Sequence, residues 1–314
     1  MVLRRSLLGV LTIVLIAILV YVATLVLPGD AATAILGQTA TPARIRLLRH
    51  QLGLDAPVIT RFLHWAWHAL RGDFGDSLSL RAPVTSLVGI RLANSAVLVA
   101  VVAAVSTGLG IVGGSLAALR RDGWLDSLAS LLALASSALP EFVVAVFVVM
   151  LLAVNVLHVF PAISLLPPGS FILSAVSKLV LPVITLVIVV TPYAFRMSRA
   201  AMIEALDSDY VEFAKLKGVP LPRILFVHAL PNACAPIVQV VGLNLLYLAG
   251  GIVLVETVFD YPGIGQMLVQ AIDNRDVPMI QFIVLALAVF CVGLNILTDV
   301  CVQLLSPRKR FPRF

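Results

Sequence analysis

The chain has 314 residues, of which 61% are hydrophobic and only 12% charged, with a formal net charge of +6. A soluble globular domain needs a larger polar surface to stay dispersed, so this composition excludes that class. The long apolar runs, in place of ~10-residue alternating segments, predict a multi-spanning α-helical protein rather than a membrane β-barrel. The basic excess indicates positive residues that flank membrane spans, and we expect no nucleic-acid partner.

Six apolar stretches predict six transmembrane helices in an all-α polytopic fold. The first stretch is too long for a signal peptide and no small-residue cleavage site follows it, so we expect a retained anchor. The predicted organisation is residues 1–27 as N-terminus and first span, 28–91 as an extracytoplasmic loop, and 92–314 as the core with the other five spans. The six spans cover about Leu7–Leu27, Leu92–Leu119, Leu128–Leu157, Val176–Phe195, Ala235–Val258 and Ile280–Leu305.

Two short helices are predicted in the loop after the first span, over about Thr41–Gly53 and Pro57–Gly72. Each begins with a proline or a cap-forming residue and ends at glycine. The second helix gathers apolar and aromatic side chains on one face, which is typical of a helix at the membrane interface. A small packed cap with no ligand role is the alternative. That face carries Phe62, Trp65 and Ala66, with Trp67 and His68 beside them.

Charge counting predicts the topology. With the N-terminus inside, the cytoplasmic segments carry thirteen Lys and Arg residues, whereas the two short outer loops carry only Lys178 and Arg275. Seven arginines lie in residues 28–92, but long loops translocate largely regardless of their charge. We therefore expect a multi-pass protein with both termini in the cytoplasm. The segment 200–233 then lies on the same side, where ATP is available.

The chain carries no GxxxxGK[ST] phosphate loop, no GxSxG elbow and no HExxH pair. Its five histidines are scattered along the chain. The three cysteines lie in or beside apolar stretches without metal-ligand spacing, so we predict no metal site. We therefore expect this chain to be no enzyme and to hold no cofactor. If ATP drives its function, ATP and Mg must be bound by partner ATPase subunits.

The polar segment 200–233 predicts a compact pair of short helices. Acidic residues precede basic ones along it, which matches a helix macrodipole, and Gly218 can close the first helix. Pro220 and Pro222 then redirect the chain into a second piece that meets Pro231. Its length and order favour a structured knob over an ordinary solvated loop.

One motif in this segment resembles a known family. Glu212-Phe213-Ala214, three residues, Gly218, nine residues, then His228-Ala229-Leu230-Pro231 looks like the EAA motif of ABC importer permeases. Phe213 and His228 depart from the usual alanine and isoleucine in a way seen in the dipeptide/oligopeptide/nickel branch. Further signatures of that branch extend the match over nearly the whole chain, and the long loop resembles that of the first, B-type permease subunit. These signatures are at 27–30, 52–55, 72–75, 256–266 and 274–276.

The resemblance implies a type I ABC importer permease fold in a bacterial inner membrane. It also implies a second, C-type permease subunit, two ABC ATPases, an extracytoplasmic substrate-binding protein and the lipid bilayer as partners. Peptides are the expected cargo, with nickel chelate or glutathione as the alternative. A stand-alone secondary transporter or channel, or a membrane scaffold, is the rival from another class. The residues implied to couple the chain to an ATPase are Glu212, Phe213, Ala214, Gly218, His228, Leu230 and Pro231.

Polar residues inside membrane spans are costly and often functional. Glu141 follows Pro140 in the third predicted span, where a proline bend can open the backbone to a cavity. We predict that Glu141 faces the translocation path and meets a peptide amino group, with a structural pair as the alternative. Glu256, Asp260 and Arg275 are predicted to form an outer gate or a docking site for the binding protein. A plain helix cap is the alternative for the two acids.

Overall fold

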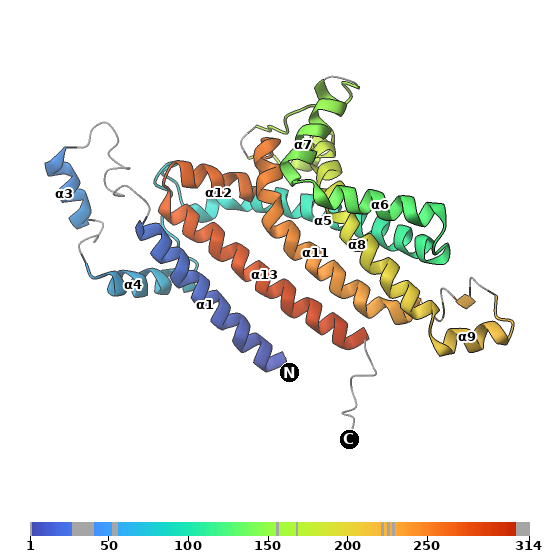
Figure 1. Ribbon diagram of the computed structural model, residues 1–314. Helices are drawn as coiled ribbons and strands as arrows, with labels where there is room; N and C mark the ends of the chain where they lie inside the picture. The colour runs from blue at the N-terminus through green and yellow to red at the C-terminus, as the bar shows by residue number, and fades with distance from the viewer. Residues whose placement is uncertain are drawn as a thin grey trace.

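The computed structural model of the chain describes residues 2–26, 41–51, 56–154, 157–167, 169–220, 223–224, 227 and 230–305. Within these residues the regular structure is helical, apart from one isolated bridge between Asp76 and Pro83. Figure 1 shows four long helices, α1, α13, α11 and α8, running side by side. The chain is therefore the all-α polytopic membrane protein that its composition predicts. In the described part of the chain, five helices are long and apolar enough to span a membrane: α1 (Val2–Val26), α5 (Val84–Leu119), α8 (Val180–Leu206), α11 (Leu230–Val258) and α13 (Val277–Leu305).

The third predicted span is broken rather than continuous. It consists of α6 (Trp124–Ala138) and α7 (Glu141–Val149), which meet at a bend of 104°, and a π-helical turn η2 (Met150–Val154) continues α7. Leu139 and Pro140 have extended backbone at this bend. The proline ring disfavours helical geometry at the preceding residue and removes a backbone donor, so the helix stops and restarts. The pair counts as a sixth span if both halves belong to one crossing.

Several helices extend beyond the apolar stretches that predict them. α5 begins at Val84, eight residues before Leu92, and α8 continues from Phe195 to Leu206. The predicted loop 200–233 therefore starts inside a helix. Hydropathy marks only the apolar part of a helix, whereas a helix continues until a cap or breaker residue ends it. The signatures at 27–30 and 52–55, His228 and the basic tail after Leu305 lie outside the described residues.

The main core lies where α5, α7, α8 and α11 meet. Two glycines of α5 let its backbone touch that of α8, since a Cβ on Gly110 would lie 2.4 Å from Ala194 Cβ. A Cβ on Gly114 would lie 2.6 Å from Phe195 O and 2.8 Å from Arg199 N. Small residues permit this approach between membrane helices. Fully buried members of the core include Leu98, Val102, Ala145, Leu186, Leu248 and Val255.

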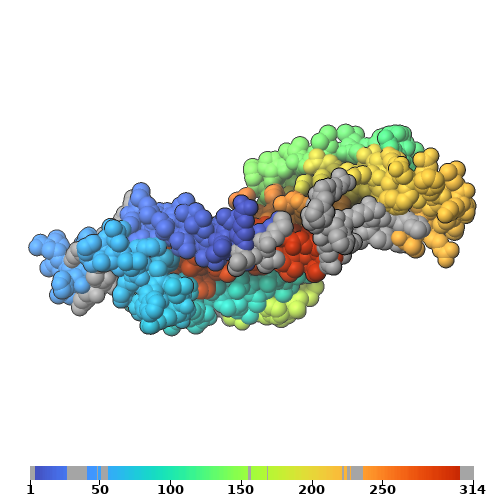
Figure 2. Space-filling view, turned by 90° about the horizontal axis from the view of Figure 1, so that it is seen from below, coloured from blue at the N-terminus to red at the C-terminus, as the bar shows by residue number. Residues whose placement is uncertain are grey.

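Shorter helices occupy the two ends of the molecule. α3 (Pro42–Gln51) and α4 (Val58–Leu70) lie at one tip, and α9 (Asp209–Leu216) lies at the other (Figures 1 and 2). η3 (Ile172–Lys178) precedes α8, and α12 (Ile264–Asp273) connects α11 to α13. The two helices predicted in the first loop are α3 and α4. α9, which belongs to the segment 200–233 predicted to contact an ATPase, is thus remote from the loop that follows α1.

Candidate functional site

α9 projects from the end of α8, beyond the bundle of long helices (Figure 1). Ser208 precedes it with extended backbone, and the Ser208 carbonyl accepts hydrogen bonds from Val211 N and Glu212 N. Asp209 and Glu212 occupy its first turn and Lys215 its last, so the charges complement the helix dipole. Val211 and Ala214 are buried against Ile224, which anchors one face of α9 to the returning chain.

Gly218 ends α9 in a Schellman motif. Gly218 N donates to Lys215 O at 2.9 Å, and Val219 N donates to Ala214 O at 3.1 Å. The motif needs a left-handed residue after the cap, and Gly218 has φ +73°. Apart from its chain neighbours and the backbone of its own helix, no atom of the described residues lies within 4 Å of where its Cβ would be, so the backbone angle, rather than space, favours glycine here.

The solvent-facing side of α9 combines charge with exposed apolar surface. Phe213 is 65% exposed and Leu216 77% exposed, and Glu212 is exposed beside them. Large apolar side chains grouped at the tip of a structured projection are typical of a contact surface. Ala214 points the other way, into the packed side. Leu230 and Pro231, also from the motif, open α11, where proline in the first turn costs no helical hydrogen bond.

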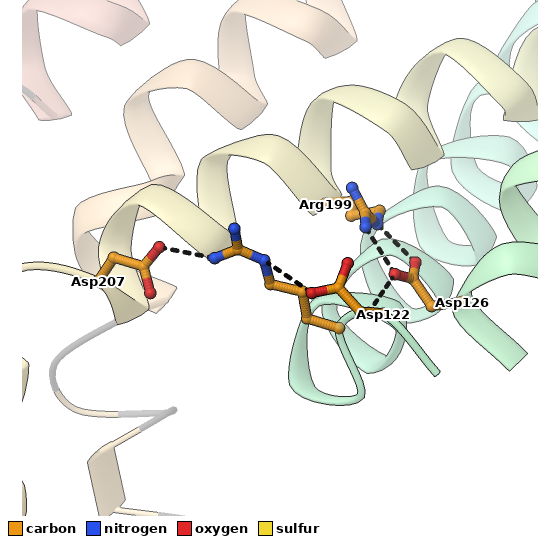
Figure 3. Close-up of polar contacts among 5 residues, drawn as sticks. Asp122, Asp126, Arg199 and Asp207 are labelled. Atoms are coloured by element: carbon orange, nitrogen blue, oxygen red, sulfur yellow. Dashed lines mark hydrogen bonds and ion pairs between the residues drawn. The ribbon is translucent and has the colours of Figure 1, made fainter. Parts of the chain in front are cut away.

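A bidentate ion pair joins α6 to α8 above this projection. Arg199 Nε and Nη2 donate to Asp126 Oδ1 and Oδ2, each at 2.6 Å (Figure 3). The Asp126 side chain is 4% exposed and that of Arg199 is 27% exposed. Asp122 N also donates to Asp126 Oδ2 at 3.1 Å. The carboxylate is therefore saturated with donors, and the pair holds α6 in a defined position against α8.

A second, looser pair lies nearer to α9. Arg121 Nη1 lies 2.9 Å from Asp207 Oδ2, and Asp207 is the residue that caps α8 immediately before α9. Both side chains are more than half exposed, so solvent screens this contact strongly. Together the two pairs connect the α5–α6 turn to the base of α9. Neither ion pair was predicted from the sequence. An acid such as Asp126 inside an apolar helix could have indicated one, because such an acid usually pairs with another polar or charged side chain.

Pro140 and Glu141 lie at the sharp bend between α6 and α7. Tyr247 of α11 donates its hydroxyl to Glu141 Oε1, and Gly251 leaves the space that the carboxylate occupies. A Cβ on Gly251 would come within 2.8 Å of Oε1. Glu141 Oε2 is buried without a hydrogen-bond partner among the described residues. The structural pair considered from the sequence is thus present with Tyr247, while one carboxylate oxygen remains open to another donor.

Two comparisons identify the family of the chain. Residues 110–311 match the family described as the binding-protein-dependent transport system inner membrane component, and residues 1–105 match its N-terminal part. A probable peptide ABC transporter permease of Sinorhizobium fredii is 34% identical over 310 residues, covering 99% of each chain. The glutathione transport system permease protein of Salmonella typhimurium is 33% identical over 310 residues, covering 98% of each.

The chain belongs to the binding-protein-dependent transport system inner membrane component family. The resemblance to ABC importer permeases that its EAA-like motif indicates is confirmed by these matches. The protein is accordingly a multi-pass inner-membrane transport component.

Glu256 of this permease is fully buried at the end of α11 and caps α12. Its carboxylate accepts hydrogen bonds from Ser95 Oγ at 2.5 Å, Gly265 N at 2.7 Å and Gln266 N at 3.1 Å. The last two are unpaired donors at the start of α12, so the acid satisfies them and complements the helix dipole. A Cβ on Gly263 would lie 2.0 Å from Oε1. This geometry shows the helix cap considered as the alternative from the sequence, and the predicted role of Glu256 at an outer gate or docking surface stays a prediction.

Asp260 and Arg275 lie near this cap without joining one common site. Asp260 has φ +50° and accepts a hydrogen bond from Gln266 Nε2. Arg91 Nη1 donates to the other end of the same glutamine side chain, Oε1, at 2.9 Å. Arg275 is exposed with φ +55°, in the turn between α12 and α13. The turn geometry explains their positions, and their predicted roles at a gate or docking surface stay predictions.

Asp276 has a structural role that was not predicted from the sequence, although it lies in the family signature at 274–276. It is 1% exposed and caps α13, since Met279 N donates to its Oδ1 at 3.4 Å. It also accepts from Leu78 N and Ser79 N, both at 3.2 Å, and from the Ser77 and Ser79 hydroxyls. Burial opposes ionisation, but these hydrogen bonds outweigh it and lower the pKa of Asp276. The acid thereby ties the segment before α5 to α13.

Among the residues that the structure describes, no group of three or more His, Cys, Asp or Glu side chains is placed to hold a metal ion. Cys291 and Cys301 are free thiols on α13. The polar side chains instead form the helix-to-helix contacts described above. These contacts fix the helices relative to one another, and the exposed face of α9 lies outside them.

Proposed function

We propose that this chain is the B-type transmembrane subunit of an ATP-driven importer and forms the translocation path for di- or oligopeptides with a second permease. The observation that carries the proposal is α9, a rigidly capped helix with one buried face and an exposed face that includes Glu212 and Phe213. A cytoplasmic ATPase subunit is the proposed occupant of that face. The remaining partners are a C-type permease, a second ATPase and an extracytoplasmic binding protein.

ATP and Mg are proposed to bind the partner ATPases, because this sequence carries no phosphate loop. Both termini and α9 are proposed to face the cytoplasm, which agrees with the distribution of basic residues. α9 can drive a change of access only if its interaction with the ATPase differs in free energy between the two states of the transporter. The buried face of α9 would then transmit the displacement of the ATPase to α8.

Glu141 is the proposed substrate contact. Its Oε2 is buried at the break between α6 and α7 and has no hydrogen-bond partner in the part of the chain that the structure describes, and a peptide amino group is a donor of the right charge. Broken helices are a common setting for substrate sites in membrane transporters. Tyr247 would hold the carboxylate in place through its bond to Oε1.

Glutathione is the second candidate cargo, and the similarity to the Salmonella typhimurium glutathione permease favours it. Glutathione is itself a short peptide with a free amino group, so the same carboxylate contact could serve both. A competition assay separates the two: unlabelled glutathione should displace a labelled dipeptide from uptake only if it shares the path. Import of a nickel chelate is the remaining cargo alternative.

The proposal is tested by purifying the chain with its co-expressed transport partners and measuring uptake in proteoliposomes. ATPase subunits should co-purify, and vanadate should stop peptide uptake. Glu212→Ala combined with Phe213→Ala should lower ATPase retention and uptake, while Glu204→Ala, an exposed acid on α8, should leave both intact. Absence of any ATPase together with vanadate-resistant uptake would overturn the importer and favour a stand-alone transporter.

A further inference from the structure

α4 presents three different surfaces around its axis. The first packs on α1, where Tyr21 lies 5.2 Å from the Phe62 ring and 5.5 Å from the Trp65 ring, measured between centroids. The second is apolar and exposed, and the third is polar or basic. At about 3.6 residues per turn the members of each surface fall in one sector. The exposed apolar sector consists of Ile59 (73% exposed), Leu63 (60%), Trp67 (55%) and Leu70 (82%); the polar sector consists of Thr60, Arg61, His64, His68 and Arg71.

The exposed apolar sector requires an explanation, because four large side chains in a row on one helix face are rarely left in water. Nothing among the described residues covers them. The helix that carries this sector packs on Tyr21 of α1, and α1 exposes Leu19 and Val22 close to that residue in the chain. These residues of α1 lie within its membrane-spanning segment, Arg4–Val26.

The height of α4 on α1 locates it relative to the bilayer. Tyr21 lies five residues before Val26, the end of the apolar span, which corresponds to about 7.5 Å along the helix axis. Interfacial amphipathic helices bury their apolar face roughly 5–10 Å into the boundary between headgroups and acyl chains. The contact with Tyr21 therefore holds α4 at the depth that such helices occupy.

The side chains at the edge of the apolar sector match that environment. Trp67 is the member of the apolar sector that borders the polar sector, and the Arg71 guanidinium lies 4.4 Å from the centroid of its ring. Tryptophan is enriched at membrane interfaces because its ring is apolar and its N–H is polar. Arginine can keep its charge in the headgroup layer while its stem covers an apolar neighbour.

We propose that α4 is a membrane-interface anchor whose face of Ile59, Leu63, Trp67 and Leu70 binds the lipid bilayer at the Val26 end of α1. The anchor has a mechanical consequence. α4 ends at Leu70, and seven residues later the chain reaches Ser77, which Asp276 holds against the start of α13. The lipid contact and the Asp276 contact thus fix the segment between them at both ends, and set its height above the membrane.

The test uses the full chain in lipid nanodiscs, because its only tryptophans are Trp65, Trp67 and Trp124. Trp65→Phe with Trp124→Phe leaves Trp67 as the sole emitter. The matched control places the emitter on the polar sector, through His64→Trp with all three native tryptophans changed to Phe. We expect lipids brominated near the top of the acyl chain to quench Trp67 more strongly than the control. Aqueous iodide should quench in the reverse order.

Equal iodide access at the two positions, with no extra quenching by brominated lipid, would overturn the proposal. Protection of Trp67 from both quenchers would also overturn it, and would favour a protein surface over the sector. Should Trp65→Phe disturb α4, a spin label on Leu63→Cys, in a chain whose native cysteines are replaced, gives an independent readout. Preferential relaxation by oxygen over a water-soluble nickel complex is then the expected result, and the opposite preference contradicts it.

Discussion

The ion pair between Asp126 and Arg199 is expected to hold α6 and α8 together as one unit, close to the surface of α9 proposed to contact an ATPase. Asp126→Asn removes the charge while keeping the size of the side chain, and leaves the Arg199 guanidinium without its anionic partner. Breaking a buried pair costs about 3–5 kcal/mol. The lower end of that range applies, because the Arg199 side chain retains 27% exposure. A loss of about 3 kcal/mol corresponds to roughly a hundredfold change in the balance between joined and separated helices.

The assay compares two quantities in the reconstituted transporter: the thermal unfolding of the complex and the number of peptides imported per ATP hydrolysed. Asp126→Asn should lower both, because under the proposed coupling a loosened α6 would no longer follow α8 when an ATPase displaces α9. Arg121→Ala, which breaks the exposed pair with Asp207, serves as the matched control and should cost only about 0.5 kcal/mol. If Asp126→Asn unfolds at the wild-type temperature and imports with wild-type stoichiometry, the reasoning about this joint is refuted.

Three further predictions concern other residues. Gly218→Val should weaken ATPase retention about tenfold, because a β-branched residue at φ +73° costs about 1–2 kcal/mol. Gly218→Asn should retain most of the binding, since asparagine tolerates this backbone angle. Equal retention by both variants would show that the backbone angle at residue 218 is unimportant. Glu141→Gln should reduce dipeptide uptake about tenfold with unchanged assembly, through loss of a charge-assisted contact, and unchanged uptake kinetics would leave Glu141 as a structural partner of Tyr247. Because the folded state lowers the pKa of Asp276, its stabilising contribution is full above the unfolded value of about 3.9 and is lost as the pH falls through the folded value. Acid unfolding followed by circular dichroism should show this step in the wild type and not in Asp276→Asn, and its persistence in the variant would assign it to another group.

Much of the architecture was predictable from the sequence, because the signals concerned are local. Spans follow from apolar length, since a bilayer requires about 20 consecutive apolar residues whatever their neighbours are. The end of α9 follows from Gly218, whose residue type alone favours the left-handed angle of a helix cap. The break at Pro140 was foreseeable for the same reason, because proline acts on its own backbone and on the residue before it.

The bounds of several helices and the size of that break were not predictable in this way. Hydropathy does not mark where α5 begins or where α8 ends, because polar residues continue both helices. Proline indicates that a helix stops, but the bend of 104° depends on how α6 and α7 pack against other elements. The Schellman bonds of Gly218 were predictable, whereas the burial of Val211 and Ala214 against Ile224 required the path of the returning chain.

By itself, then, the sequence determined that the protein is a membrane-embedded helical bundle with a structured, glycine-capped projection of a known family type. Only the tertiary structure decided which polar residues meet. Hydrogen bonds join Asp126 to Arg199, Glu256 to Ser95, and Asp276 to Ser77, although these partners are 73, 161 and 199 residues apart in the chain. Each acid is surrounded along the chain by several possible partners, and local periodicity cannot choose among them. The choice follows from helix packing, which brings one donor set into range and excludes the water that would otherwise compete for it.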